Sequence, residues 1–266
     1  MRNEMFDKNC TLLLNTCDAY SDCWDGFFKL LKIQWPEFSM PVVLNTESLS
    51  YSFDGMDIRV SNTKPKTSWG KRLITALKRI DTKYILFALE DFYLESPVDS
   101  SKLLKCYEWM EKNPEVACFS FYPTEDENNT PSEKYPGFER RPQRGEYRLN
   151  CQICLWNREK LISYIRPHEN PWEWELYGSR RSSRYKEEFY TLMHSEKAVF
   201  DYNRGAIIMR GRWWMEKVLP LNEKYNLEID FSRRGSFEEY RQTVRKKKRN
   251  LLRGIKNRIN KIRSLI

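Results

Sequence analysis

The sequence predicts an α/β protein with a mostly parallel central sheet flanked by helices. Short apolar runs that end in polar residues alternate with amphipathic segments over residues 11–122. This alternation is typical of strands joined by crossover helices. The chain has 266 residues, of which 40% are hydrophobic and 14% aromatic, so we expect one large core with an appendage.

Apolar runs predict the strands. Residues 11–14, 42–44 and 84–88 have the length and composition of buried strands, and residues 57–60 and 115–122 fit two more. Ligands of open α/β sheets bind outside the carboxyl ends of the strands. The polar residues that follow three of these runs are therefore expected to form a nucleotide cleft, namely residues 15–18, 45–47 and 90–91.

Helices are expected over residues 24–33, 69–80 and 158–165, and from Ser100 or Ser101 to Met110. In the longer segments apolar residues recur every three to four positions, as on one buried helix face. Residues 123–148 show no period and predict a long loop that is functional or mobile. The chain lacks G-x-x-x-x-G-K-[ST] and G-x-G-x-x-G motifs, which disfavours a P-loop or dinucleotide enzyme.

The net charge of +9 is concentrated at the carboxyl end. Residues 241–266 contain eleven Lys or Arg and no Asp or Glu, which leaves residues 1–240 with a net charge of −2. Apolar residues recur in the tail at helical spacing, which predicts a basic amphipathic helix on an anionic membrane surface. A helix that packs on the body or on a partner is the alternative. The absence of aromatic residues from the tail disfavours nucleic acid as a partner.

The expected location is the cytoplasm, peripheral on the inner face of the plasma membrane. The first ten residues contain no apolar leader, and the run 84–89 is too short to span a bilayer. The seven cysteines fit a reducing compartment. Cys151 and Cys154 form a lone C-x-x-C in an apolar context, and core packing is favoured over a zinc or redox site.

Glu90 and Asp91 are the first candidate site residues. A carboxylate at the mouth of a buried strand can hold Mg²⁺ or Mn²⁺ against a diphosphate, because hard cations prefer oxygen ligands. The competing interpretation is that the two acids only end a strand and begin a turn.

Glu173 and Glu175 lie between Trp172 and Trp174. In an extended segment the two acids would share one side and the two tryptophans the other. A carboxylate beside an aromatic wall and a second acid tends to have a raised pKa, which suits a base that accepts a proton from a sugar hydroxyl. A tryptophan-anchored loop with solvated acids is the alternative.

Basic residues could meet a phosphate. Arg72 lies on the helix before the Asp91 strand, and four more arginines follow in the second half: Arg180, Arg181, Arg210 and Arg212. Arginine can neutralise a departing diphosphate. Each of them could equally be a solvated surface residue. His168 and His194 are the only histidines, which disfavours a catalytic pair of histidines. A structural role is favoured for His194 over contact with a phosphate or a metal.

In their order along the chain, these motifs resemble bacterial GT-A-type glycosyltransferases that use nucleotide sugars and build capsular or lipopolysaccharide chains. The resemblance covers about residues 10–215 and rests on residues 11–18, 69–77, 84–92 and 170–175. It implies a catalytic domain over 1–240, with a nucleotide-binding half (1–122) and an acceptor-side half (149–215). The appended tail is 241–266.

The resemblance also implies roles for individual residues. Leu89-Glu90-Asp91 corresponds to the family's D-x-D motif, with Leu89 in place of the first Asp, so metal-dependent and metal-free chemistry both stay open. Glu175 would act as the base with Glu173 as its partner. The remaining roles are donor-nucleotide binding by Thr16, Asp18, Arg72, Glu90 and Asp91, acceptor binding by Trp172 and Trp174, and diphosphate binding by Arg210 and Arg212.

The implied activity is transfer of a sugar from a nucleoside diphosphate sugar to a hydroxyl of a lipid-linked glycan, with inversion. A nucleotidyltransferase also uses acidic strand ends, although it brings a Gly-rich basic loop after the first strand, and none follows Asp18. A membrane-associated scaffold or carbohydrate-binding module is the non-catalytic alternative.

Overall fold

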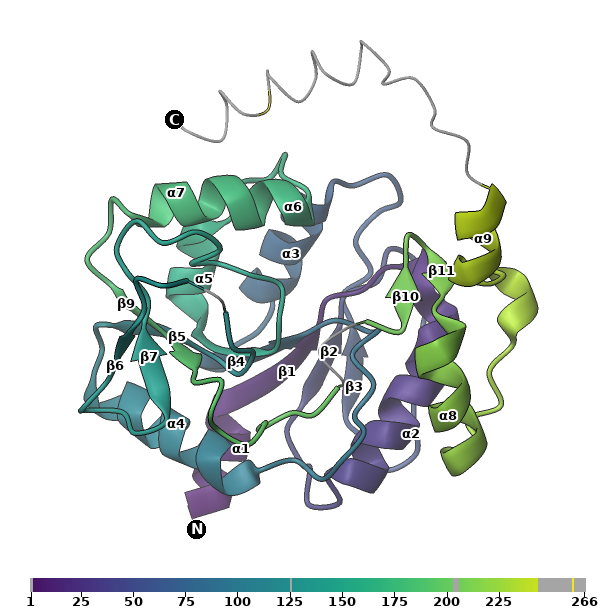
Figure 1. The fold of residues 1–266 in the computed structure, drawn as a ribbon, viewed down its shortest axis with the longest axis horizontal. Helices are drawn as coiled ribbons and strands as arrows, with labels where there is room; N and C mark the ends of the chain where they lie inside the picture. Colours follow the sequence, from purple (N-terminus) through teal and green to yellow (C-terminus); the bar gives the residue numbers. More distant parts are fainter. Residues whose placement is uncertain (1, 125, 203–205, 244–259, 261–266) are drawn as a thin grey trace.

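The computed structural model describes residues 2–124, 126–202, 206–243 and 260. These residues form an α/β fold in which a central sheet lies between two layers of helices (Figure 1). The predicted fold class is confirmed.

Nine strands form the central sheet within the described residues, in the order β3-β2-β1-β4-β8-β5-β9-β7-β6. Strands β7 and β8 run opposite to the other seven, so the sheet is mostly parallel. A separate hairpin is formed by β10 (Ile208–Met209) and β11 (Arg212–Trp213). The strands of the sheet are β1 (Cys10–Leu14), β2 (Val42–Leu44), β3 (Ile58–Val60), β4 (Tyr84–Ala88), β5 (Val116–Ser120), β6 (Thr130–Pro131), β7 (Phe138–Arg140), β8 (Cys154–Asn157) and β9 (Glu188–Leu192).

Each face of the sheet has its own apolar core. One face packs against α1 (Arg2–Asn9), α2 (Trp24–Gln34), α4 (Ser100–Lys112) and α8 (Met215–Tyr225). The other packs against α3 (Trp69–Lys78), α5 (Arg158–Tyr164) and a helical segment at residues 171–182. That segment consists of α6 (Pro171–Glu173), the π-turn η2 (Trp174–Gly178) and α7 (Ser179–Ser182). Short elements complete the described fold: η1 (Asp18–Cys23), η3 (Phe231–Arg233) and α9 (Phe237–Thr243).

Elements with strong patterns form where the sequence predicts them. Strand β4 has the predicted bounds, and its five residues are all buried. Helices α2 and α3 coincide with the amphipathic segments, and Leu73 and Leu77 of α3 are fully buried against the sheet. The apolar period thus located these elements because it matches the faces they bury.

Residues 123–148 depart from the prediction of a long loop. Strand β7 within this region pairs with β9, and β6 pairs with β7. Tyr135 and Phe138 are fully buried in the core. The aromatic side chains that fix this region are too far apart to produce a period, so the sequence pattern missed them.

The predicted core packing of Cys151 and Cys154 is confirmed. All seven cysteines are free, and both Cys151 and Cys154 are buried in the core. The predicted amphipathic helix over 241–266 lies outside the described residues, apart from 241–243 and Asn260. Within the described part of the chain, no helix combines the length and the apolar character needed to cross a membrane.

Candidate active site

The carboxyl ends of β1, β2 and β4 meet at one edge of the sheet. Leu14 pairs with Leu44 of β2 and with Ala88 of β4. The Asn15 amide donates to the Ala88 carbonyl at 2.9 Å, and the Asn45 amide donates to the Leu14 carbonyl at 3.0 Å. The polar segments predicted to form a cleft are therefore neighbours in space.

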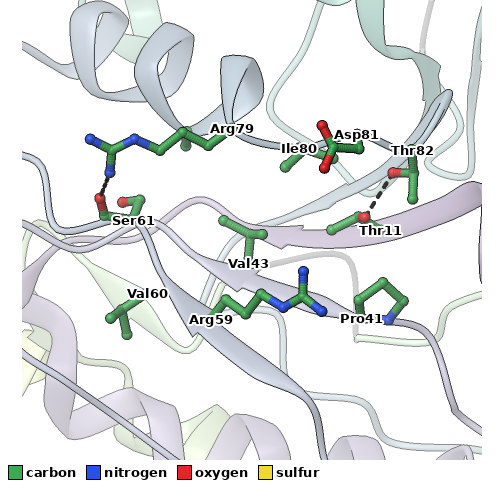
Figure 2. Close-up of a pocket in the computed structure, with 11 residues that line it drawn as sticks. Thr11, Pro41, Val43, Arg59, Val60, Ser61, Arg79, Ile80, Asp81 and Thr82 are labelled. Atoms are coloured by element: carbon green, nitrogen blue, oxygen red, sulfur yellow. Dashed lines mark hydrogen bonds between the residues drawn. The ribbon is translucent and has the colours of Figure 1, made fainter.

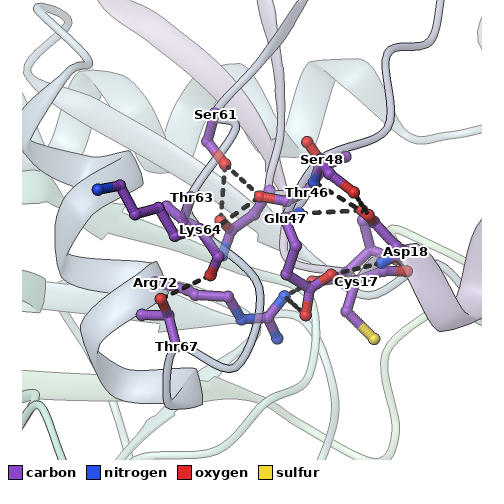
Figure 3. Close-up of polar contacts among 12 residues, drawn as sticks. Cys17, Asp18, Thr46, Glu47, Ser48, Ser61, Thr63, Lys64, Thr67 and Arg72 are labelled. Carbon is purple, nitrogen blue, oxygen red and sulfur yellow. Dashed lines mark hydrogen bonds and ion pairs between the residues drawn. The ribbon is translucent and has the colours of Figure 1, made fainter.

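Asp18 fastens the end of β1 to the loop after β2 (Figure 3). Its Oδ1 accepts from the Glu47 amide at 2.9 Å, and its Oδ2 accepts from the Ser48 amide at 2.9 Å, the Ser48 hydroxyl at 2.6 Å and the Leu49 amide at 3.2 Å. Partial burial opposes ionisation, but these hydrogen bonds prevail and lower the pKa of Asp18. We infer that Asp18 holds this loop, because its two oxygens accept four hydrogen bonds from Glu47, Ser48 and Leu49.

Glu47 and Arg72 complete this arrangement. Glu47 accepts the Asp18 amide through Oε2 at 2.7 Å and meets Arg72 Nη1 through Oε1 at 3.0 Å. The same Nη1 donates to the Thr16 carbonyl at 3.1 Å, and Arg72 is 6% exposed. We call Asp18, Glu47, Ser48 and Arg72 the β1–β2 clamp. The clamp places Thr16 and Arg72 at the predicted nucleotide end of the sheet.

Glu90 and Asp91, the acidic pair at the end of β4, are held differently. Glu90 is 7% exposed, and burial followed by the charge of Asp91 raises its pKa, against a hydrogen bond from Thr16. Burial also raises the pKa of Asp91. Asp91 Oδ1 is shielded from solvent and has no hydrogen-bond partner among the described residues. An orphaned carboxylate oxygen of this kind is costly unless a ligand meets it.

The acidic pair fits a divalent cation that is shared with phosphates. Mg²⁺ commonly takes one or two protein carboxylates and fills its other positions with phosphate and water. Leu89 packs between the two cores instead of adding a carboxylate. The described residues contain no group of three or more His, Cys, Asp or Glu placed to hold a metal. A cation held by Asp91 and Glu90 would therefore need further oxygen ligands from a bound phosphate or from water.

Arginines gather beside the acidic pair. A cavity of about 330 Å³, here called the arginine pocket, is lined by six residues: Ala19, Arg210, Gly211, Arg212, Arg233 and Arg234. Asp22 is the carboxylate that pairs with them in the described structure. It lies 2.6 Å from Arg234 Nε, 2.5 Å from Arg234 Nη2 and 3.9 Å from Arg233 Nη1. Four guanidinium groups against one carboxylate leave an excess of positive charge.

The arginine pocket adjoins the end of β4. The charge of Arg234 acts against the raised pKa of both Glu90 and Asp91, and the Ile207 amide donates to the Asp91 carbonyl at 3.1 Å. The structure thus brings together Arg210 and Arg212, which the sequence analysis had named, with Arg233 and Arg234, which it had not. The adjacent arginines before Gly235 were a visible signal, but their position beside η1 depends on contacts more than 200 residues apart.

The segment around Glu173 and Glu175 is helical, so the predicted extended conformation is wrong. Asn170 and Glu173 form a capping box, with both hydrogen bonds at 3.0 Å, and Pro171 occupies the first helical position. Glu175 lies in the π-turn η2, and its Oε1 accepts from the Cys151 amide at 2.8 Å. Glu173 and Glu175 therefore accept hydrogen bonds from different parts of the chain. The N-x-x-E spacing with Pro171 was the signal that could have predicted this helix.

Glu175 lies beside Cys151, and the charge of Asp91 also acts on the Cys151 thiol. Burial raises the pKa of Glu175, and the Cys151 hydrogen bonds and the charge of Arg141 oppose this shift. Burial raises the pKa of the Cys151 thiol, and the charges of Glu175 and Asp91 raise it further. Both carboxylates are thus close enough to the same thiol to act on it. Single π-turns inside helices often occur at functional sites.

The two tryptophans have opposite environments. Trp174 is fully buried, with ring centroids 5.8 Å from Trp69 and 6.2 Å from Trp156. It cannot stack on an acceptor sugar without leaving the core, so that prediction is wrong for Trp174. Trp172 is 76% exposed and is free to meet an acceptor.

Arg181 is a structural residue. It forms a buried two-pronged ion pair with Glu169, at 3.0 Å from Nη1 to Oε1 and 2.9 Å from Nη2 to Oε2. This pair fixes α7 against the loop that precedes α6. Arg180, in contrast, is exposed.

A second cavity lies away from these residues (Figure 2). It measures about 220 Å³ and is bounded in part by Thr11 and Thr82, whose hydroxyls are 2.7 Å apart, and by Arg59 and Arg79. Thr11 is near the start of β1, and Thr82 precedes β4. This side of the cavity therefore lies toward the amino ends of those strands, opposite the candidate site.

No protein-family model matches the chain, and no curated protein sequence matches it. Solved structures resemble its fold. A fragment of S. aureus TarS is 11% identical, with a TM-score of 0.46 over 71% of this chain and 59% of its own, so this chain spans less than two thirds of it. An active-site mutant of LgtC is 12% identical, with a TM-score of 0.41 over 66% of this chain and 70% of its own.

Structures of the TarS fragment in complex with UDP and with UDP-GlcNAc also match. A cytidylyltransferase from Leptospira borgpetersenii is 12% identical, with a TM-score of 0.39 over 84% of this chain and 97% of its own.

Proposed function

We propose that this protein is a glycosyltransferase that moves a sugar from a nucleoside diphosphate sugar to a hydroxyl of a lipid-linked glycan, in the synthesis of a cell-surface polysaccharide. One observation carries the proposal. Asp91, whose Oδ1 has no hydrogen-bond partner among the described residues, accepts from the Ile207 amide through its carbonyl, close to the hairpin whose Arg210 and Arg212 line the arginine pocket. A cluster of arginines that suits a phosphate thus lies close to an acid with one unpaired oxygen.

The donor side is formed by the arginine pocket and the strand ends. The excess positive charge of the pocket suits a diphosphate, and Arg210 and Arg212 would steady it as the glycosyl bond breaks. Thr16 and Arg72 would line the nucleotide end. Asp91, helped by Glu90, would hold Mg²⁺ or Mn²⁺, and such a cation neutralises phosphate charge.

The acceptor side is formed by Glu175 and Trp172. Glu175 would take the proton of the acceptor hydroxyl as that oxygen bonds to the anomeric carbon and the bond to the diphosphate breaks, with inversion. Burial raises its pKa and makes it a stronger base than a solvated carboxylate. Trp172 would present its exposed ring to the acceptor at the end that is joined to the lipid. Glu173 caps the helix that carries Glu175.

A nucleotidyltransferase fits less well. Such enzymes place a Gly-rich basic loop after the first strand, whereas residues 15–18 contain no glycine and lead into η1. A scaffold that only binds glycan would not need an orphaned acid beside four arginines.

Residues 1–240 would form the catalytic domain and 241–266 a tail that binds an anionic membrane surface. We expect deletion of 241–266 to reduce pelleting with anionic vesicles. Unchanged pelleting would remove the tail from membrane binding.

Calorimetric titration of UDP, GDP and CMP tests the proposed function, with and without Mn²⁺. We expect one nucleotide to bind selectively, and Asp91→Asn to weaken that binding by about tenfold or more, because the carboxylate meets the cation or a donor hydroxyl. Asp57→Asn is the matched control, since Asp57 pairs with Arg59 at the surface. Failure of every nucleotide to bind would contradict the proposal.

A further inference from the structure

Trp172 and Leu176 form an exposed apolar ridge on the helical segment 171–182. They are 76% and 41% exposed, respectively. Residues four apart lie on the same side of a helix, so the two side chains are neighbours. A tryptophan this exposed is unusual, and its amphipathic ring suits the boundary between water and lipid.

Exposed basic side chains lie on the same helical segment as this ridge and on the neighbouring α3 region. Arg180 is exposed on the next turn of the segment, and Lys64, Lys66 and Lys71 are exposed on and before α3. The two regions adjoin, because the Gly70 amide donates to the Glu169 carbonyl at 3.0 Å and the Trp69 and Trp174 rings are 5.8 Å apart. Figure 1 shows α3, α6 and α7 on the same side of the sheet.

Acidic residues on this surface are already engaged. Residues 61–71 contain no Asp or Glu. Glu173 accepts from the Asn170 amide, and Glu175 accepts from the Cys151 amide. In Figure 3 the Lys64 side chain extends away from the clamp. The surface formed by Lys64, Lys66, Lys71, Trp172, Leu176 and Arg180, here called the α3–α6 face, is therefore positively charged around an apolar centre.

One described residue of the carboxyl-terminal segment, Asn260, lies next to this face. Asn260 Nδ2 donates to Glu173 Oε1 at 3.0 Å, which places this residue of the 241–266 segment beside Trp172. That segment contributes eleven Lys or Arg. The net charge of that segment therefore has the same sign as the charge of the α3–α6 face.

We propose that the α3–α6 face docks on an anionic lipid surface, with Trp172 and Leu176 inserted at the interface and the lysines and Arg180 on the headgroups. Buried apolar area and basic residues near anionic lipid both add to such binding. The inference extends the proposed function, because the Glu175 side of the site would then face the membrane that carries a lipid-linked acceptor. Membrane binding by this face can be measured without enzymatic activity.

Vesicle co-sedimentation of the full chain tests the face. The vesicles contain phosphatidylcholine alone or mixed with phosphatidylglycerol. We expect the double variant Trp172→Ser/Leu176→Ser to partition about tenfold more weakly onto the anionic vesicles, from the lost apolar insertion. Lys64→Glu/Lys66→Glu should also weaken partitioning, and added salt should do so for the wild type. Ile33→Ser/Leu49→Ser, at exposed apolar residues elsewhere, should bind as the wild type does.

Wild-type partitioning by Trp172→Ser/Leu176→Ser would overturn the proposal and leave the tail as the membrane contact. An equal loss in Ile33→Ser/Leu49→Ser would overturn it as well, because the effect would not belong to this face. A change in oligomeric state with unchanged partitioning would assign the ridge to a protein contact. Nucleotide titration of the wild type keeps the two proposals apart, since it can fail while vesicle binding still depends on the face.

Discussion

The β1–β2 clamp and the acidic pair are two acidic sites at the same edge of one sheet, and they differ in how their oxygens are satisfied. In the clamp, both oxygens of Asp18 accept hydrogen bonds, and Glu47 meets a buried arginine. In the acidic pair, Asp91 Oδ1 has no partner in the described structure, and burial raises both carboxyl pKa values. The first site stabilises the fold, and the second has capacity left for a ligand.

The energetics follow from this difference. Hydrogen bonds to a charged group contribute about 1.5–3 kcal/mol each, whereas a buried group without a partner costs about 1–3 kcal/mol. The clamp should therefore appear in the free energy of unfolding. The acidic pair should appear in ligand binding, because a ligand restores the partner that the fold omits.

Glu175→Gln should have the largest effect and extends the comparison to a third acid. Glu175 keeps one hydrogen bond from Cys151, so the amide should fit the same place. We expect turnover to fall about 10²–10⁴-fold, as for loss of a general base, with donor affinity retained. Initial-rate kinetics together with calorimetry measure both. Glu159→Gln, at an exposed surface acid, is the control, and full activity of Glu175→Gln would remove Glu175 from the mechanism.

Asp18→Ala tests the clamp itself. The substitution leaves the amides of Glu47, Ser48 and Leu49 without their acceptor, so the free energy of unfolding should fall by about 3 kcal/mol. Denaturant unfolding measures the change. Asp57→Ala, which breaks an exposed pair with Arg59, should cost less than about 1 kcal/mol. Equal losses of unfolding free energy in the two variants would mean that the clamp stabilises the fold no more than an exposed ion pair does.

The pH dependence of stability tests the acidic pair. Because burial raises the folded-state pKa of Glu90, the native state holds more protons than the unfolded state between about pH 4 and neutrality, and stability from this group falls as pH rises through that window. Glu90→Gln should remove on the order of 2 kcal/mol of this decline. Denaturant unfolding at several pH values between about 4 and neutrality tests this prediction. Parallel curves of unfolding free energy against pH for the wild type and Glu90→Gln would contradict it.

Arg210→Gln should have the smallest effect. Arg210 is exposed, so its loss should leave stability unchanged while donor nucleotide affinity falls about fivefold, from one lost phosphate contact. Calorimetry of the nucleotide detects the change. Arg59→Gln, a surface arginine away from the pocket, is the control, and equal affinities for both variants would place the diphosphate elsewhere.

Much of the fold could be predicted from the sequence, because its strongest elements bury one continuous face. Strand β4 and helix α3 have local patterns that match their burial. Strands β6 and β7 could not be found in this way. They are two and three residues long and are fixed by buried aromatics such as Tyr135, which touch distant parts of the chain.

The site was predictable only in part. The residue types at the strand ends were visible, but the sequence gives no sign that both oxygens of Asp18 have partners while Asp91 Oδ1 has none among the described residues. Those partners depend on how the loop after β2 folds back on β1. The pairing of Arg234 with Asp22 joins residues 212 positions apart. Trp172 and Trp174 look alike in the sequence, and only the helical conformation of residues 171–182 separates an exposed ring from a buried one.

The most direct test crosses Asp18→Asn with Asp91→Asn and measures the free energy of unfolding and donor nucleotide affinity for both. Asp18→Asn should lose about 2 kcal/mol of stability and keep its affinity, because the amide nitrogen cannot accept the hydrogen bonds of the clamp. Asp91→Asn should keep or gain stability and lose about tenfold or more in affinity. If Asp91→Asn instead destabilises the fold and binds nucleotide normally, the acidic pair is structural and the proposed site is wrong.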